Sequence, residues 1–225
     1  MTDSERTDLG HEIRRYILEN PEIVLEAVLK LQQQEEMAEA EQGRAQIDLF
    51  SSELFDDKNS WSGGNLNGDI TMVEFFDYRC GFCRRSQDII DELIASDGNI
   101  RLVLKEFPIL GEDSEFASRI AVSVLQLAGR PAYKRVHDML ITHRGAFDQE
   151  VIVEAAELAG LSPEILSEQM YEDSATGILT ANHTLALELG INGTPAYVIG
   201  GRLVNGFNEL EQLRDVVAEE RVWQN

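Results

Sequence analysis

Cysteine is nearly absent from this chain: only two residues, Cys80 and Cys83, occur among 225. A fold stapled by several disulfides is therefore excluded, and so is a zinc site built from four cysteines. Histidine is also scarce, and the four histidines are scattered without the spacing of paired metal ligands. We therefore expect no metal-binding site.

Positive charge is scarce as well. Lysine and arginine number 19 against 41 acidic residues, which gives a formal net charge of -22. Such a charge argues against nucleic acid and anionic membrane surfaces as partners. No apolar run reaches the roughly 18 residues of a membrane span. Residues 1–6 are polar and no apolar segment of a signal peptide follows them, which taken alone favours the cytoplasm.

The two cysteines lie where one sequence pattern gives way to another. Residues 70–76 are rich in β-branched and aromatic side chains and predict a buried strand, whereas residues 86–98 have apolar side chains at helical spacing. A Cys-x-x-Cys pair at such a junction places Cys80 at a helix N-terminus, where unpaired N–H groups and the helix dipole favour the thiolate. The pKa of Cys80 should then fall from about 8.5 toward roughly 3.5–7.5. We predict that Cys80 is the nucleophile and Cys83 the resolving thiol.

Two structural roles for the pair are less favoured. A structural disulfide between Cys80 and Cys83 would close a very short loop and contribute little through loop-closure entropy. A zinc site would need further ligands that the histidine spacing does not supply. Redox chemistry is the stronger interpretation. It requires no organic cofactor, because the Cys80–Cys83 disulfide is itself the redox-active group.

The N-terminal part predicts two helices, at about residues 9–19 and 22–41, with Asn20-Pro21 between them as the start signal of the second. A helix as long and polar as the second has little to pack on within its own domain. We interpret residues 1–45 as a helical stalk that pairs with copies of itself. The alternative is an amphipathic helix lying on the catalytic domain. The second helix carries one apolar stripe, formed by Val24, Val28 and Leu31.

Residues 46–225 predict a catalytic domain of mixed elements. The segment between Phe107 and Ala196 is too long for a single crossover helix, so we expect a helical insertion at about residues 111–190. The other expected elements are an edge strand near 54–57 or 60–62, a strand at 100–107, a hairpin at 190–206 that turns at Gly200-Gly201, and a last helix at 208–221.

This order of elements resembles the DsbA-like branch of the thioredoxin superfamily over roughly residues 60–225. The specific points of likeness are residues 73–78 leading into Cys80-Gly81-Phe82-Cys83, the helical insertion, and Gly193-Thr194-Pro195-Ala196. The resemblance implies an α/β thioredoxin fold with a large helical insertion. Residues 17–24 are similar to the extension of suppressor-of-copper-sensitivity protein C and its relatives, some of which are trimeric disulfide isomerases. That likeness implies an N-terminal oligomerisation stalk and a homotrimer.

The resemblance also assigns candidate site residues. It implies a cis peptide bond before Pro195, beside both sulfurs, which leaves backbone groups of Thr194-Pro195 free to pair with an extended substrate. We therefore expect Thr194 and Pro195 to act with the cysteines and, together with Gly81 and Phe82, to contact substrate. Threonine before this proline is more typical of the isomerase members than of the oxidase that gives the branch its name. Without a nearby Cys-x-x-Cys, Thr194-Pro195 would predict only the start of a strand.

Glu74 is an acid in the middle of an apolar strand and matches the position of a buried acid in this family. A buried, unpaired carboxyl has a raised pKa and can pass protons to the resolving thiol Cys83. The alternative is a structural ion pair with Lys105 on the neighbouring strand. We include Glu74 among the candidate catalytic residues.

Three arginines surround the cysteine motif of an otherwise acidic chain. They either stabilise the Cys80 thiolate or are solvated residues at the start of the helix. The residues are Arg79, Arg84 and Arg85.

We expect a protein thiol–disulfide oxidoreductase, and specifically a disulfide isomerase that reshuffles wrong disulfides in secreted proteins. Its partners would be unfolded or misoxidised proteins and a membrane redox protein that resets the cysteines. Oligomerisation would surround one substrate with several active sites and raise their effective concentration. The alternatives are a monomeric DsbA-like dithiol oxidase and a protein that binds copper(I) between two soft thiolates. Disulfide chemistry and the resemblance together favour the periplasm, with a signal peptide removed.

Overall fold

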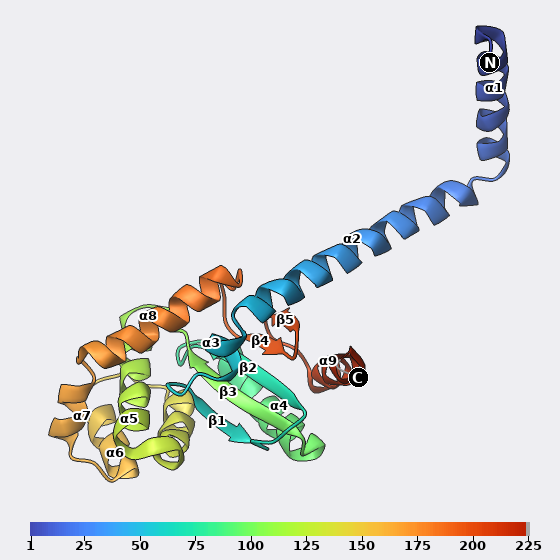
Figure 1. The fold of residues 1–225 in the computed structure, drawn as a ribbon. Helices are drawn as coiled ribbons and strands as arrows, with labels where there is room; N and C mark the ends of the chain where they lie inside the picture. The colour runs from blue at the N-terminus through green and yellow to red at the C-terminus, as the bar shows by residue number, and fades with distance from the viewer. Residues whose placement is uncertain (224–225) are drawn as a thin grey trace. The chain divides into compact units, whose positions relative to one another are not determined.

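The computed structural model describes residues 1–223, and two compact units are distinguished, residues 1–44 and the residues from 45 onward. Helix α2 contributes to both units. No helix in the described part of the chain combines the length and the apolar character that crossing a bilayer requires. In chain order the elements are α1 (Asp3–Glu19), α2 (Glu22–Leu49), α3 (Ser51–Phe55), β1 (Trp61–Gly64), β2 (Ile70–Phe76), α4 (Gly81–Asp97), β3 (Ile100–Glu106), α5 (Glu112–Thr142), α6 (Gln149–Ala159), α7 (Pro163–Gln169), α8 (Asp173–Glu188), β4 (Ala196–Ile199), β5 (Arg202–Asn205) and α9 (Leu210–Trp223) (Figure 1).

The first unit consists of α1 and the N-terminal part of α2. Helix α1 begins earlier than predicted because Thr2 and Glu5 form a capping box that satisfies its first N–H groups. The predicted break at Asn20-Pro21 is confirmed, because α1 ends at Glu19 and α2 begins at Glu22. The Asn20 side chain donates to the carbonyl oxygen of Tyr16 and so caps the end of α1, while its carbonyl oxygen accepts from the N–H of Ile23 at the start of α2.

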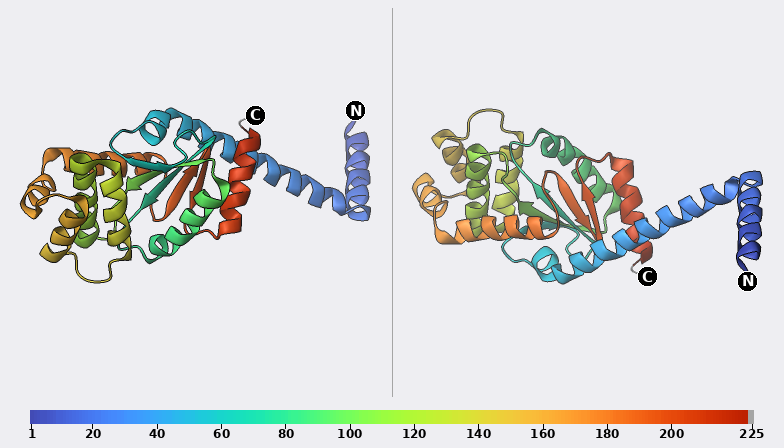
Figure 2. Two further views of the ribbon diagram at one scale, coloured as in Figure 1. Left: turned by 90° about the horizontal axis from the view of Figure 1, so that it is seen from below. Right: turned by 90° about the horizontal axis from the view of Figure 1, so that it is seen from above.

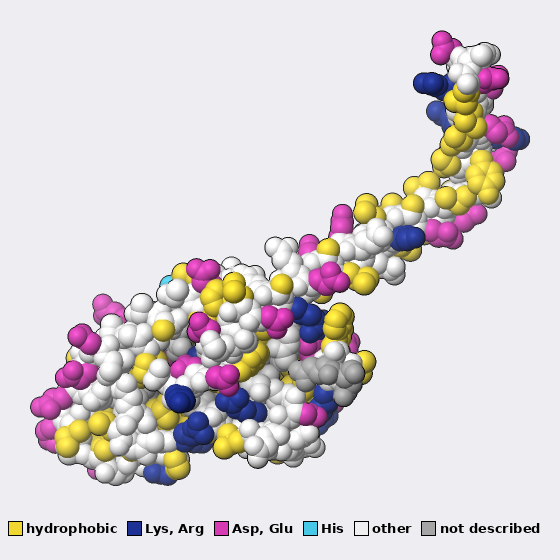
Figure 3. All heavy atoms as spheres, viewed as in Figure 1, with side chains coloured by type: hydrophobic (Ala, Val, Ile, Leu, Met, Phe, Trp, Pro, Cys, Tyr) yellow, Lys and Arg dark blue, Asp and Glu magenta, His cyan; other side chains and the backbone are white. Residues whose placement is uncertain are grey.

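Apolar side chains remain exposed along both helices of this unit. No residue of α1 is buried, and Leu9, Ile13 and Tyr16 are each about half exposed. The predicted stripe on α2 is likewise exposed, with Val24, Val28 and Leu31 between 46% and 55% accessible. Hydrophobic side chains follow α1 and the first turns of α2 in Figure 3. An unburied stripe of this kind is typical of a helix that pairs with another chain.

The second unit is built on a five-stranded sheet with the order β1-β3-β2-β4-β5. Strands β2 and β3 are parallel and joined through α4, whereas the remaining neighbours are antiparallel. The strand, helix, strand and hairpin predictions around the cysteines are thereby confirmed. Of the two positions predicted for the edge strand, 54–57 is wrong because residues 51–55 form the single-turn helix α3. The edge strand is β1, close to the other predicted position at 60–62.

Alternate residues of each strand point to opposite faces of the sheet. On one face, Met72, Leu102 and Ile199 pack under α4 and α9. On the other, Val73, Val103 and Val198 pack against the end of α2, α3 and α8. Figure 2 shows α4 and α9 on the opposite side of the sheet from α3 and α8. The thioredoxin-like sheet is therefore covered on both faces.

Helices α5–α8 form the insertion between β3 and β4, as predicted. Helix α5 is interrupted at Gly129, which has φ 76° and ψ -175°, a conformation that favours glycine. Pro131 then begins the second part of α5. Helix α7 begins with Ser162 as N-cap, whose hydroxyl accepts from the N–H of Ile165, and with Pro163 in the first turn.

Candidate active site

Both cysteines are reduced and lie at the start of α4. Cys80 is the N-cap residue, and its sulfur accepts a hydrogen bond from the backbone N–H of Cys83 at 3.4 Å. Cys80 is 6% exposed and Cys83 2%, so the first sulfur lies nearer the surface. Between them, Gly81 and Phe82 are exposed, and the Phe82 side chain is 55% accessible.

The two sulfurs have opposite electrostatic environments. Hydrogen bonds from the Cys83 thiol, the Thr194 side chain and the backbone N–H groups of Cys83 and Phe82 lower the pKa of Cys80 from 9.0 to about 5, against the effect of burial. Burial, the hydrogen bond to Cys80 and the nearby Glu74 raise the pKa of Cys83 far above its usual range. At neutral pH Cys80 is therefore a thiolate and Cys83 a thiol, the division of roles that a nucleophile and a resolving thiol require.

The peptide bond between Thr194 and Pro195 is cis, as the resemblance implied. This bond lies against the first sulfur: Cys80 Sγ is 3.2 Å from the carbonyl oxygen of Thr194, to which the protonated thiol donates. Pro195 precedes β4, and its carbonyl oxygen accepts a hydrogen bond from the N–H of Gly206 at 2.9 Å. The segment that we expect to hold substrate is thus fixed within contact distance of Cys80.

Glu74 is buried behind the cysteines with 5% of its surface exposed. Burial, the charge of Asp91 and the charge of Cys80 together raise the pKa of Glu74 to about 8. Its cross-strand neighbour Tyr197 has a buried hydroxyl with no hydrogen-bond partner among residues 1–223. Glu74 also raises the pKa of Cys83, which places the carboxyl within electrostatic range of the resolving thiol.

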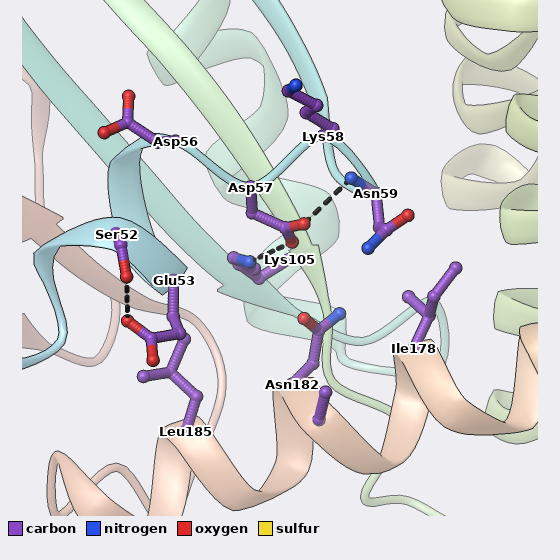
Figure 4. A pocket seen from close by; sticks show the side chains of 11 residues that line it. Ser52, Glu53, Asp56, Asp57, Lys58, Asn59, Lys105, Ile178, Asn182 and Leu185 are labelled. Atoms are coloured by element: carbon purple, nitrogen blue, oxygen red, sulfur yellow. Dashed lines mark hydrogen bonds and ion pairs between the residues drawn. The ribbon is translucent and has the colours of Figure 1, made fainter.

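The alternative ion pair between Glu74 and Lys105 is wrong. Lys105 pairs in register with Phe75, so it points to the opposite face of the sheet from Glu74. There the Lys105 ammonium lies 2.5 Å from Asp57, at a pocket of about 480 Å³ lined by residues of α3, α8 and the loop after α3 (Figure 4). Burial lowers the pKa of Lys105, and the Asp57 carboxylate opposes that effect.

Arg79, Arg84 and Arg85 form their hydrogen bonds, ion pairs and ring contacts with groups other than the Cys80 sulfur. Arg79 donates to the carbonyl oxygen of Gly145 and lies 3.6 Å from Asp113. Arg84 donates to the carbonyl oxygens of three residues, which joins the start of α4 to the end of α5. Arg85 stacks on aromatic rings. The alternative of solvated residues holds for Arg79 and Arg85, which are exposed, whereas the contributions that lower the pKa of Cys80 are hydrogen bonds from Cys83, Thr194 and Phe82.

Asp77 is a site residue that the sequence analysis missed. It is fully buried, and its carboxylate accepts hydrogen bonds from the N–H of Arg79 at 2.7 Å and from the Ser114 hydroxyl at 2.7 Å. It also accepts from the N–H groups of Ile109 and Leu110. One side chain thus joins the turn before Cys80 to the start of the insertion. In the sequence, only its position three residues before Cys80 indicates a role for Asp77, because most of its partners lie more than 30 residues later in the chain.

A buried polar network behind the motif was also missed. Its centre is Glu106, whose pKa is raised to about 8 by burial. His137 contacts a phenolic oxygen of this network through Nδ1 at 3.1 Å and Gln87 of α4 through Nε2 at 3.2 Å. The network therefore links the cysteine-bearing helix to the insertion. Three hydroxyl groups donate to the Glu106 carboxylate, those of Tyr78, Tyr133 and Ser118.

Comparison with protein families matches residues 71–218 to the DSBA-like thioredoxin domain. The chain belongs to the DsbA-like thioredoxin family. The match covers the cysteine motif, the insertion and the cis-proline segment. Residues 5–38 separately match the N-terminal domain of copper resistance protein ScsC, in line with the predicted resemblance of this extension.

Solved structures agree with this assignment. A thioredoxin-like oxidoreductase from Silicibacter pomeroyi is 39% identical, with 76% of this chain and 96% of that one aligned and a TM-score of 0.69. The thiol-disulfide exchange protein alpha-DsbA2 from Wolbachia pipientis is 29% identical, with 81% and 97% covered and a TM-score of 0.73. Proteus mirabilis ScsC in a transitional conformation is 26% identical, covers 98% of each chain and has a TM-score of 0.71. The chain spans 24% of the length of two Salinispora Na⁺/H⁺ antiporters that it also matches.

Proposed function

We propose that this protein is a thiol–disulfide oxidoreductase that acts as a disulfide isomerase on misoxidised proteins. The observation that carries the proposal is the contrast between an acidic Cys80 and a neutral, buried Cys83 beside the cis Thr194–Pro195 bond. Membership of the DsbA-like family supports the chemistry, and the ScsC-type extension supports the isomerase role. No organic cofactor takes part in this mechanism.

In the first step, the Cys80 thiolate attacks one sulfur of a substrate disulfide. A mixed disulfide forms, and the other substrate sulfur leaves as a thiolate. The half-buried Thr194, which precedes the buried Pro195, pairs with the substrate backbone, while Gly81 and Phe82 contact side chains near the substrate cysteine. In isomerisation a substrate thiolate then attacks the mixed disulfide, which gives a new substrate disulfide and releases the Cys80 thiolate without net oxidation.

Cys83 provides the escape from a mixed disulfide that no substrate thiol resolves. Its proton passes to the Glu74 carboxylate, and the Cys83 thiolate attacks the sulfur of Cys80 and expels the substrate thiolate. A carboxyl with a pKa of about 8 exchanges this proton near neutral pH. The enzyme leaves this route oxidised and needs a dithiol or a membrane reductant to reset it.

The N-terminal helices favour the isomerase over the oxidase. We propose that residues 1–45 assemble three chains through their exposed apolar stripes, so that three active sites share one substrate and an oxidising membrane protein is kept away. We place this activity in the periplasm, where protein disulfides persist.

The test is the reactivation of a protein with scrambled disulfides by the full chain, by a chain lacking residues 1–44, and by full-length Val28→Glu. Sedimentation would report the oligomeric state of each protein, and Cys80→Ala is the inactive control. Isomerase activity that falls when the stripe is interrupted, with dithiol oxidation retained, is the expected result. A full chain that oxidises dithiols but never reactivates the scrambled substrate would leave the monomeric-type oxidase as the function.

The copper(I) alternative is tested separately. The described part of the chain holds no group of three or more His, Cys, Asp or Glu side chains placed to bind a metal ion, so this alternative rests on the two cysteine sulfurs. Titration of the reduced protein with copper(I) against a competing chelator measures this directly. Binding that outcompetes the chelator, in a protein without isomerase activity, would replace the catalytic proposal.

A further inference from the structure

The structure places an aromatic and cationic surface directly beside the cysteines. Phe82, two residues after Cys80, lies with its ring 6.1 Å from the ring of Phe207. Arg85 lies over both rings, with its guanidinium carbon 4.5 Å from the centre of the Phe207 ring and 5.9 Å from that of Phe82. We call Phe82, Arg85 and Phe207 the aromatic–arginine surface.

This surface is continuous with the segment that we expect to hold substrate. Phe207 follows β5, and the preceding Gly206 adopts φ 79°, which turns the chain back toward α4. The N–H of Gly206 donates to the carbonyl oxygen of Pro195, so the loop that carries Phe207 is joined to the cis-proline. A polypeptide that lies along Pro195 therefore passes close to Phe207 and Arg85.

The guanidinium of Arg85 is held in place but not neutralised. Arg85 is exposed, and no carboxylate lies within ion-pair distance of it in residues 1–223. Stacking occupies the flat face of a guanidinium and leaves its edge N–H donors available, and these match a carboxylate. Because the rings already restrict the side chain, it loses little further freedom on binding.

Charge complementarity indicates the occupant. The chain has a formal net charge of -22, yet Arg79, Arg84 and Arg85 bring positive charge to the start of α4. Arg85 lies five residues after Cys80 on a helix that rises about 1.5 Å per residue. That distance corresponds to about two residues of an extended substrate, at roughly 3.3 Å each.

We propose that the aromatic–arginine surface selects polypeptide segments with an acidic side chain about two residues from the reactive cysteine and an apolar side chain beside it. The carboxylate pairs with Arg85, and the apolar side chain lies on the ring of Phe82. The inference rests on the proposed thiol–disulfide exchange and names the substrate segments that this exchange favours.

The experiment uses the reduced full chain and short peptides whose single cysteine is capped by 2-mercaptoethanol through a disulfide. The peptides carry Glu, Gln or Lys two residues from the cysteine, on either side, with Leu as neighbour. Release of peptide thiol, followed by chromatography of acid-quenched samples, gives the exchange rate. We expect the Glu peptide to react about 2- to 5-fold faster than the Lys peptide at low salt, in the range of exposed charge pairs. This ratio should fall toward one as the salt concentration rises.

Variants separate the surface from the general charge of the protein. Arg85→Glu should reverse the preference, and Phe207→Ala should reduce it because the ring no longer holds the guanidinium. The matched control is Arg130→Glu, which makes the same charge change at an exposed position about three helical turns before the end of α5. It should keep the preference of the unmodified chain. Thermal unfolding of each variant would verify that it is folded.

Two outcomes would overturn the inference. Equal rates for the Glu and Lys peptides with the unmodified chain, or an unchanged preference in Arg85→Glu, would show that Arg85 does not select substrate. A chain that exchanges with none of the peptides, the neutral Gln peptide included, would instead refute the proposed function and the inference with it.

Discussion

The acidity of Cys80 is predicted to depend first on the Cys83 thiol. That thiol is the largest of the contributions that bring the pKa of Cys80 to about 5, ahead of Thr194 and the backbone N–H groups. A hydrogen bond to a charged group contributes about 1.5–3 kcal/mol, and a pKa unit corresponds to about 1.4 kcal/mol. Cys83→Ala should therefore raise the pKa of Cys80 by about one to two units, whereas Cys83→Ser keeps a hydroxyl donor and should raise it less.

The measurement is the absorbance of the thiolate as the pH is varied, supported by the pH dependence of alkylation by iodoacetamide. Both variants contain a single cysteine, so the signal belongs to Cys80 alone. The unmodified reduced chain should show one transition near pH 5, because the pKa of Cys83 is raised beyond the range of the titration. An identical pKa in Cys83→Ala and in the unmodified chain would refute this reasoning and assign the acidity to the N–H groups at the helix start.

Two further predictions concern the buried charges on the two faces of the sheet. The folded-state pKa of Glu74, about 8, lies above its ordinary value of 4.5, so the unmodified chain should lose a few kcal/mol of stability as the pH rises from about 4.5 through 8. Urea unfolding should show a smaller loss in Glu74→Gln, which keeps only the loss due to Glu106, whose pKa is also raised to about 8. The variant should also resolve mixed disulfides more slowly, and parallel pH profiles for the two proteins would contradict the assignment. Lys105→Met should lower the free energy of unfolding by about 2–3 kcal/mol. This loss is smaller than the loss expected on breaking a fully buried ion pair, because Asp57 keeps its hydrogen bonds from Asn59 and Ser60. Adding Asp57→Asn should recover most of that loss, and a double variant no more stable than Lys105→Met would argue against the pair.

The sequence predicted the parts of this fold that depend on local patterns. The strand at 70–76, the helix that ends at Gly98 and the hairpin at Gly200-Gly201 each have a signal of residue type within a few positions. Two positions were predicted for the edge strand because a window of four or five residues does not separate a period of 2 from one of 3.6. Leu54, fully buried in α3, fits either pattern.

Errors at the site arose where a side chain takes its partner from a distant segment. Glu74 and Lys105 were paired because they occupy neighbouring strands, but the register places them on opposite faces and supplies Asp57 to Lys105 from a loop 48 residues earlier. The arginines near the motif were related to Cys80 by proximity in sequence, whereas Arg84 reaches carbonyl groups at the end of α5. Such partners depend on three-dimensional packing, which composition and spacing do not encode.

The buried Asp77 carboxylate has a consequence for the order of events as the chain folds. Ile109, Leu110 and Ser114, which bond to it, come between 32 and 37 residues later in the chain than Asp77 itself. Before those residues dock, the Asp77 side chain lacks three of the donors that fix the turn leading into Cys80. The placement of the reactive sulfur at the start of α4 therefore depends on a part of the chain that is synthesised after both cysteines.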